Sequence, residues 1–405
     1  MNSRSNPTLL SVFMHDPYKI GGIEMFAREL SAQLAERGCD SALYFNANPP
    51  PSVRQFLQLP NVRLSVLPER SAKVLHINDF LDCLRSVRPR ILHLHFTGLI
   101  NPLLWLARCN GVGRIFSTDH QSRQEGPVRK CPAPKRWAAR LITWPLTKRI
   151  AVSRFILMRN EREGIISPGK LYHIYNGIDL RRVCDVSAGR SYRNRLGISS
   201  DRLVVMQVGS LIPEKGGQLL ISALAKAIPR NPLLHGLLVG KGPLAAEMRQ
   251  QAERSGIAKH LTFAQVSVDP FGEGVFAAAD LVCCPSVWEE AFGFTLPEAM
   301  AHQKPVIATA VGAIPEIVED GKTAFLIERN DVDTLTEKIL QLAADAELRK
   351  RIGLAAQDAV RRRFNLTERV SELLRVYDLG NFSSVPLFQT TASTSLTGGG
   401  IQIFQ

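Results

Sequence analysis

Residues Pro285 to Met300, PSVWEEAFGFTLPEAM, decide how the fold of this chain is interpreted. The apolar run from Ala277 to Cys284, which contains one charged residue, Asp280, precedes them and predicts a buried strand that stops at Pro285. The loop after the strand is expected to enter a helix at Pro297. Proline is favoured as the first helical residue, because the N–H that it lacks would have no acceptor within the helix. Strand, loop and helix in this order are typical of the carboxyl edge of a parallel sheet.

The loop and the start of that helix are predicted to bind an anion. Helix N-termini combine unpaired N–H groups with the positive end of the helix dipole. Here these N–H groups belong to Phe294, Thr295 and Leu296. Two carboxylates, Glu290 and Glu298, frame the loop with seven residues between them. Taken alone, they would be a solvated loop residue and a side chain that complements the dipole, but the flanking residues favour a binding site.

The flanking residues carry a family resemblance. Glu-x7-Glu preceded by Pro285-Ser286 and followed by Ala299-Met300-Ala301 resembles the signature of the retaining nucleotide-sugar glycosyltransferases of family 4. The resemblance implies an α/β fold of two Rossmann-like, doubly wound domains that face a central cleft, known as the GT-B fold. It also implies that Glu298 holds the ribose hydroxyls, that Glu290 contacts the donor sugar, and that the loop amides hold the diphosphate.

Composition indicates an ordinary globular protein with an excess of positive charge. At 405 residues the chain exceeds what one core usually supports, so two domains are expected. Apolar residues make up 45% and charged residues 21%, which excludes a disordered composition. The net charge of +13 indicates an anionic partner such as nucleotide phosphate, nucleic acid or acidic lipid. Nucleic acid is the least favoured of these, because the basic residues are not arranged around a recognised nucleic-acid module.

Cysteine usage and hydropathy predict a cytoplasmic location. The seven cysteines are odd in number and scattered, and none forms a C-x-x-C pair, which indicates a reduced protein. The apolar run Thr8 to Met14 is too short for a secretory signal, and no uninterrupted apolar run approaches the length of a membrane span.

An N-terminal, acceptor-side Rossmann-like domain is predicted over residues 1–183. Its opening is a strand at 9–14, then Gly21 and Gly22, then a helix that ends near Gly38. Backbone at the two glycines can approach a phosphate or sugar closely. They do not complete a G-x-G-x-x-G fingerprint and alone indicate only a turn, but their position matches the glycine-rich loop that in the resembled family reaches the donor. Further short strands, expected at 63–67, 91–96, 114–118 and 150–152, favour a parallel sheet.

Three histidines lie on or just after predicted strands of this domain. His93 and His95 lie two residues apart on one strand and therefore point to one face. They are predicted to be buried or at the cleft edge rather than metal ligands, because no third ligand stands at a recognisable spacing. His120 stands after the strand at 114–118, where ligands of open sheets bind. The Thr118-x-His120 pattern resembles the family segment that brings a histidine beside the donor sugar; a surface histidine is the alternative.

Residues 123–162 are the most basic part of the chain, with eleven Lys or Arg against two Glu. Trp137, Leu141 and Trp144 are interleaved with Lys135, Arg136 and Arg140. Such a helix can lie on an anionic membrane, where each nearby cation adds about 1 kcal/mol. The alternative is a core-packed helix with a solvated basic face. In related enzymes this region borders the acceptor site, so the resemblance implies a lipid-linked or anionic acceptor.

A linker at 184–202 and a C-terminal donor-binding Rossmann-like domain at 203–365 are predicted next. A strand at 203–208 precedes Gly209-Ser210 and the helix 218–227. Lys215 is placed to neutralise a phosphate at the start of that helix. Ser210 stands where many family members have Arg, so the usual pair of cations is reduced to one. Gly240 is the donor-side glycine after the strand 236–239, and Lys241 is expected to be a solvated loop lysine.

The C-terminal part completes the resemblance, which covers about residues 8 to 379. A helical run is expected at 332–363, and a helix at 366–379 resembles the one that crosses back to the first domain. Gln303 and Ala324 stand where the family usually has glycine. Residues 380–405 lack a helical period and have little charge, which predicts a disordered tail.

Together these features predict a glycosyltransferase that moves a sugar from a nucleoside-diphosphate donor to an acceptor hydroxyl, with retention of configuration. The catalytic residues are predicted to be Glu290, Lys215 and His120. No metal or other cofactor is expected, because a cation and a helix dipole face the diphosphate. Phosphorolysis or epimerisation on the same fold and a non-catalytic nucleotide-sugar binder are the alternatives. The donor base, the sugar and the acceptor are left open.

Overall fold

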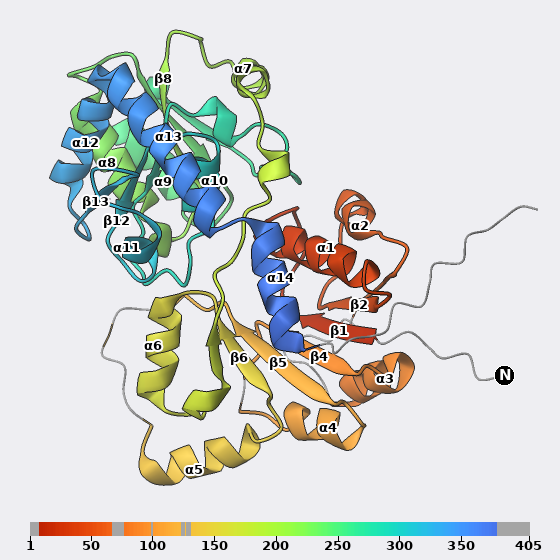
Figure 1. Ribbon diagram of the computed structural model, residues 1–405. Coiled ribbons are helices and arrows are strands. Elements are labelled where there is room, and N and C mark those ends of the chain that lie inside the picture. Colours follow the sequence, from red (N-terminus) through yellow and green to blue (C-terminus); the bar gives the residue numbers. More distant parts are fainter. Residues whose placement is uncertain (1–7, 67–76, 99, 123–125, 127–130, 379–405) are drawn as a thin grey trace, which may run out of the picture.

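Two parallel sheets, each with helices around it, make up the computed structural model of this protein (Figure 1). The structure describes residues 8–66, 77–98, 100–122, 126 and 131–378. The first sheet has seven strands in the order β3-β2-β1-β4-β5-β6-β7, and the second has six in the order β10-β9-β8-β11-β12-β13. Both orders reverse between the first strand of the domain and its fourth, which is where doubly wound sheets bind ligands. The predicted α/β fold with two Rossmann-like units is confirmed.

The first sheet is built from apolar strands that the helices cover. Its strands are β1 (Thr8–Phe13), β2 (Asp40–Phe45), β3 (Val62–Val66), β4 (Ile91–His95), β5 (Arg114–Asp119), β6 (Lys148–Ala151) and β7 (Leu171–His173). Its helices are α1 (Gly22–Ala35), α2 (Pro51–Leu57), α3 (Ile77–Val87), α4 (Leu103–Cys109), α5 (Ala133–Ile142) and α6 (Arg154–Glu163), with a 3-10 turn at Pro168–Lys170. The strands predicted from the sequence agree with β1, β3, β4, β5 and β6 to within two residues at each end.

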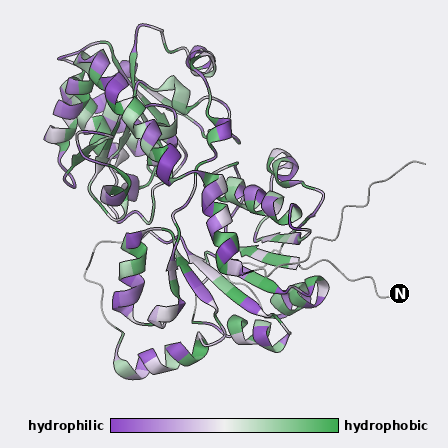
Figure 2. Cartoon of the chain, in the orientation of Figure 1, coloured by the Kyte–Doolittle hydropathy of each residue, from purple (hydrophilic) through white to green (hydrophobic). Residues whose placement is uncertain are grey.

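The second sheet repeats this construction. Its strands are β8 (Leu203–Val208), β9 (Leu234–Val239), β10 (Leu261–Ala264), β11 (Leu281–Cys284), β12 (Val306–Thr309) and β13 (Phe325–Ile327). Its helices are α8 (Gly217–Ala227), α9 (Ala245–Arg254), α10 (Thr295–Ala301), α11 (Ile314–Ile317), α12 (Val332–Ala344) and α13 (Ala346–Arg363), with 3-10 turns at Leu180–Arg182, Pro213–Lys215, Ala258–His260 and Phe276–Ala278. Hydrophobic residues concentrate in the strands, and the helices alternate between hydrophobic and hydrophilic residues (Figure 2).

Two predicted boundaries around the central stretch are wrong. The expected strand at 277–284 is divided into a 3-10 turn, Phe276–Ala278, and the shorter strand β11. Asp280 separates the two, because its carboxylate accepts the N–H of Val204 at 2.6 Å and pairs with Arg193 at 2.8 Å. Helix α10 begins at Thr295 rather than at Pro297, which is its third residue.

The segment predicted to be a linker, 184–202, contains a regular helix, α7 (Val186–Arg195). The Asp185 side chain caps it by accepting the N–H of Ala188 at 3.0 Å. Arg193 then donates to the carbonyl of Ala278 at 2.7 Å, so that α7 packs on the second half of the chain. This helix within the linker was not predicted from the sequence.

The last helix, α14 (Leu366–Tyr377), returns to the first sheet and lies beside α1 (Figure 1). It is preceded by a parallel bridge between Ile178 and Asn365. A Cβ on Gly177 would overlap the backbone of Leu366, so the close approach of the two segments requires glycine there. The predicted helical run 332–363 is interrupted at Asp345, whose side chain caps α13. The predicted tail, 380–405, lies outside the described residues.

Candidate active site

A cleft of about 280 Å³ lies between the carboxyl edges of the two sheets. From the first half of the chain it is lined by Lys19, Ile23, Phe96, His120, Ser122, Val152 and Asn176. From the second half it is lined by residues 207–210, Lys215, residues 283, 284 and 286, residues 290–296 and Ile314. The lining residues follow β1, β4 and β5 on one side and β8 and β11 on the other, which is the position expected for the ligand site of two facing doubly wound sheets.

An ion pair between Lys215 and Glu290 lies in this cleft. Lys215 Nζ lies 2.6 Å from Oε1 of Glu290, and the Ser286 hydroxyl donates to the same oxygen at 2.7 Å. Glu290 is buried, whereas Lys215 is partly exposed. The approach depends on Gly216, which has a left-handed φ of 65° and on which a Cβ would overlap the Pro285 carbonyl oxygen. Two of the three residues predicted to be catalytic are thus in contact, and Lys215 keeps two N–H donors for a bound anion.

Ser122 brings the first half of the chain to this pair, and sequence reasoning missed it. Its hydroxyl accepts the backbone N–H of Ala291 at 3.2 Å and lies 3.4 Å from Oε2 of Glu290. Only the closeness of the β5 loop to the 290–291 turn makes this side chain relevant, and no local signal in the sequence marks it.

Lys19 is a second missed residue. It lines the cleft two residues before Gly21, and while burial raises the pKa of Glu298, the positive charge of Lys19 offsets part of that rise. Ser210 also lines the cleft and is exposed. The cleft therefore contains two lysines, one from each half of the chain, beside the serine that replaces the usual arginine.

The loop before α10 is only partly free to bind an anion. Phe294, Thr295 and Leu296 line the cleft as predicted. The N–H of Leu296, however, donates to the Gly293 carbonyl at 3.0 Å, so the prediction of a free N–H at this position is wrong. The Thr295 hydroxyl donates to the carbonyl of Val208 at 3.2 Å, which fixes the loop against β8.

Gly21 and Gly22 are not among the residues that line the cleft. A Cβ on Gly22 would overlap the Phe294 ring, so Gly22 is needed for contact between the two halves of the chain rather than for open access to a ligand. Gly21 precedes α1, and its N–H donates to Glu24 at 2.9 Å. Direct contact of the two glycines with the donor stays a prediction.

Glu298 lies one turn into α10 and is half-buried, outside the lining of the cleft. Burial raises its pKa to about 7. Gly240 is also outside the lining, and a Cβ there would overlap the carbonyl oxygen of Gly209, so this glycine serves backbone packing. Lys241 is exposed, as predicted, and its Nζ stands 4.5 Å from the centre of the Tyr18 ring.

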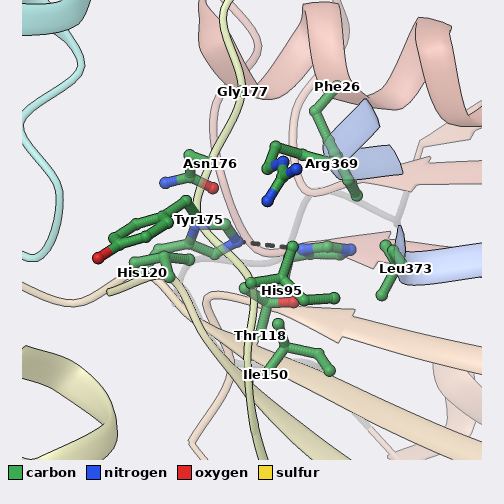
Figure 3. Close-up of a pocket in the computed structure, with 12 residues that line it drawn as sticks. Phe26, His95, Thr118, His120, Ile150, Tyr175, Asn176, Gly177, Arg369 and Leu373 are labelled. Carbon is green, nitrogen blue, oxygen red and sulfur yellow. Dashed lines mark hydrogen bonds between the residues drawn. The ribbon is translucent and has the colours of Figure 1, made fainter. Parts of the chain in front are cut away.

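His120 joins the cleft to a smaller inner chamber (Figure 3). The chamber has a volume of about 30 Å³ and lies beneath Tyr175 and Asn176. The His120 ring stacks on Phe96 at 4.6 Å, and burial lowers its pKa to about 3. His93 and His95 are fully buried, as predicted. Within the described residues, no group of three or more His, Cys, Asp or Glu side chains could hold a metal ion.

An exposed aromatic and basic surface lies away from the cleft, on and just after α5. Trp137, Leu141 and Trp144 are 71%, 66% and 70% exposed, which excludes the core-packed alternative for this helix. Lys135, Arg136 and Arg140 accompany them. We call these six residues the α5 face. Residues 123–125 and 127–130 of the predicted basic segment lie outside the described residues. Among the residues that the structure describes, no helix is long and apolar enough to span a membrane.

Comparison with known proteins covers most of the chain. The profile of glycosyltransferase family 4 matches residues 20–182, and that of glycosyl transferases group 1 matches residues 190–359. The chain is 34% identical over 195 residues to D-inositol 3-phosphate glycosyltransferase of Actinosynnema mirum, which covers 46% of each chain. It is 28% identical over 291 residues to phosphatidyl-myo-inositol mannosyltransferase of Mycobacterium leprae, covering 71% of this chain and 73% of that one.

The first of these matches spans about half the length of the curated relative. Among solved structures, the Anabaena protein Alr3699/HepE in complex with UDP and glucose aligns with a TM-score of 0.74 at 20% identity. The alignment covers 93% of this chain and 100% of the Anabaena chain, so the fold is shared throughout. The two profiles, the order of the strands and this alignment agree: the chain belongs to the group 1 glycosyltransferases of family 4 and has their GT-B fold.

Proposed function

We propose that this protein transfers a sugar from a nucleoside-diphosphate donor to an acceptor hydroxyl with retention of anomeric configuration. The contact between Lys215 and Glu290 carries the proposal, because it places a cation and a buried carboxylate 2.6 Å apart in the cleft between two Rossmann-like sheets. The Anabaena structure, which holds UDP and glucose, supports a nucleotide-sugar donor as the class of ligand.

In the proposed reaction, the acceptor oxygen forms a bond to the anomeric carbon while the bond from that carbon to the diphosphate oxygen breaks. The proton of the acceptor hydroxyl passes to the departing phosphate on the same face of the sugar. The leaving diphosphate gains negative charge, which Lys215, Lys19 and the loop before α10 stabilise. Glu290 and His120 orient the sugar, and Glu298 accepts hydrogen bonds from the ribose hydroxyls. The residues supply this stabilisation without a metal ion.

A lipid-linked or anionic acceptor at the inner face of the cytoplasmic membrane is proposed, in the synthesis of a surface polysaccharide or glycolipid. The α5 face supports it, because exposed tryptophans together with cations suit the interface of an anionic bilayer. One lysine contact points the same way: Lys170 Nζ lies 5.6 Å from the centre of the Trp144 ring. The Mycobacterium leprae relative is a phosphatidyl-myo-inositol mannosyltransferase, a name that specifies a lipid acceptor for that enzyme.

The transfer assay compares Glu290→Gln with Glu289→Gln. Glu289 is the matched control, because it is the neighbouring carboxylate but pairs with Arg329 at 3.1 Å. Transfer from the donor that the protein accepts should fall about 100-fold or more in Glu290→Gln and stay close to wild type in Glu289→Gln, with unchanged unfolding midpoints. Equal activity of the two variants would refute the assignment of Glu290.

The same assay distinguishes the alternatives. Replacing the acceptor by orthophosphate tests phosphorolysis, and following the donor alone tests epimerisation. Product that forms only with orthophosphate, or a converted donor without any acceptor, would replace transfer by one of these reactions. Donor binding without any turnover would leave a non-catalytic nucleotide-sugar binder.

Flotation with liposomes tests the membrane contact. The wild type should float with vesicles that contain anionic lipid and remain at the bottom with neutral vesicles. Trp137→Ser combined with Trp144→Ser should abolish flotation without loss of stability, because both side chains are exposed. Binding that is independent of lipid charge, or of the two tryptophans, would contradict this part of the proposal.

A further inference from the structure

A buried histidine, His95, and a half-buried one, His120, form a direct contact beside the proposed sugar site. His95 Nδ1, at the end of β4, lies 3.2 Å from His120 Nε2, after β5 (Figure 3). The His95 ring is fully buried, stacks on Phe13 at 4.4 Å and meets the edge of Phe26 at 5.6 Å. These contacts leave the His95 ring little freedom to turn, so it is a rigid support for His120.

The pair has a fixed number of hydrogens to share. Burial lowers the pKa of both imidazoles, so each is neutral and carries one N–H. One of these N–H groups is used in the contact between the rings. The two remaining nitrogens, His95 Nε2 and His120 Nδ1, are buried and have no hydrogen-bond partner among the described residues. Whichever ring donates, one of these nitrogens is an N–H donor and the other an acceptor.

The surroundings of the inner chamber favour one of these two arrangements. His95 and Arg369 both line it, and Arg369 Nε is another buried N–H without a partner among the described residues. Because an arginine can only donate, the chamber favours an acceptor at His95 Nε2. Its volume of about 30 Å³ is that of one water molecule, which can accept from Arg369 and donate to His95.

We propose that His95 is a positioning residue for the sugar transfer: its Nδ1–H donates to His120 Nε2 and so fixes His120 as the tautomer that carries hydrogen on Nδ1. The buried Nδ1–H of His120 is then a donor without a partner among the described residues, and it serves an oxygen of a bound donor or acceptor once that ligand displaces the atoms that cover it in the free protein. The inference rests on the proposed function only for that last use. The tautomer and orientation of His120 follow from the contacts of the free protein.

Nitrogen NMR of protein labelled at its nine histidines tests the tautomer directly. Signals of His120 are assigned by their loss in His120→Ala. The wild type should show one neutral tautomer with hydrogen on Nδ1. His95→Leu should give a mixture of the two tautomers, whereas His95→Asn, whose amide can still donate from the Nδ1 position, should retain one. Hydrogen on Nε2, or a His120 signal that is unchanged by His95→Leu, would overturn the proposal.

A matched control separates positioning from stability. His93 is equally buried on the same strand, but it bonds the Thr118 and Tyr377 hydroxyls instead of His120. His93→Leu should leave the tautomer of His120 unchanged. Arg369→Met, at a partly exposed residue, provides a variant that retains the fold if His95→Leu does not; it should also produce a mixture of tautomers.

Kinetics then test the link to transfer. His95→Leu should lower kcat about tenfold with little change in KM, and the same change should have no further effect in the His120→Ala background. Equal, additive losses in both backgrounds would mean that His95 acts only through stability. If His120→Ala itself leaves transfer unchanged, the assignment of His120 to the reaction fails, while the NMR result still decides the tautomer.

Discussion

At the scale of the residue, Lys19 is the main addition to the sequence-based site. The family resemblance correctly drew attention to Ser210, where a cation is missing, but it gave no sign of a replacement from the first half of the chain. Lys19→Met should weaken binding of the diphosphate about tenfold, because a charge-assisted contact is lost. Ser210→Arg should strengthen it. Titration calorimetry measures both, with Lys241→Met as the control outside the cleft. Equal affinities in Lys19→Met and wild type would remove Lys19 from the site.

Glu298 predicts a pH dependence at the same scale. Burial raises its pKa from 4.5 to about 7, so the native carboxyl keeps a proton that the unfolded chain has already released. Between these values the native state binds more protons, and the stability contributed by this group falls as the pH rises. Glu298→Gln should therefore gain in melting temperature relative to wild type as the pH rises from about 5 to about 8. Melting curves that shift in parallel would contradict the raised pKa.

At the scale of the element, α10 ends under strain. Gln303 follows its C-cap with a left-handed φ of 57°, the position at which glycine is preferred. Gln303→Gly should raise the stability by about 0.5 kcal/mol, as relief of the backbone strain outweighs the added freedom of the unfolded chain. Gln303→Ala is the control, because it also removes the bond to Gln357 but keeps a Cβ. A midpoint that is lower in Gln303→Gly than in Gln303→Ala would show that φ is not the cause.

Elements were predictable wherever local pattern decides them. The strand at 203–208 was predicted with its observed ends, because the apolar run stops there at Gly209. The break that Asp280 makes in the run 277–284 could not be predicted from local pattern. Asp280 sits within an apolar run, yet its ion pair with Arg193, 87 residues away, divides that run. Helix α7 was missed for a similar reason: its charged sequence predicts a linker until its partners are known.

At the scale of the whole molecule, Glu316 connects the two halves of the chain. Its carboxylate accepts the N–H groups of Arg154 and Phe155, at 3.0 and 2.9 Å, and the hydroxyl of Tyr175 at 2.9 Å. It thus occupies the N-terminus of α6, where negative charge is favourable. Sequence alone could place Glu316 after β12 and α6 after β6, but not the contact between them.

Loss of this contact should open the cleft. In Glu316→Ala, the amides of Arg154 and Phe155 should exchange hydrogen faster, and the radius of gyration from X-ray scattering should increase. Glu319→Ala is the control, since that carboxylate pairs with Lys322 at 2.6 Å within its own segment. If exchange and scattering are the same in both variants, Glu316 does not hold the two halves together.

The central claim is that the cleft binds a nucleoside diphosphate, and a thermal-shift panel of UDP, GDP and ADP tests it most directly. One diphosphate, at about 100 times its Kd, should stabilise the wild type by about 2.7 kcal/mol and raise its melting temperature. The same nucleotide should have a clearly smaller effect on Lys215→Met and on Glu298→Ala. A melting temperature that none of the three nucleotides raises, or a shift that both variants retain in full, would contradict the account.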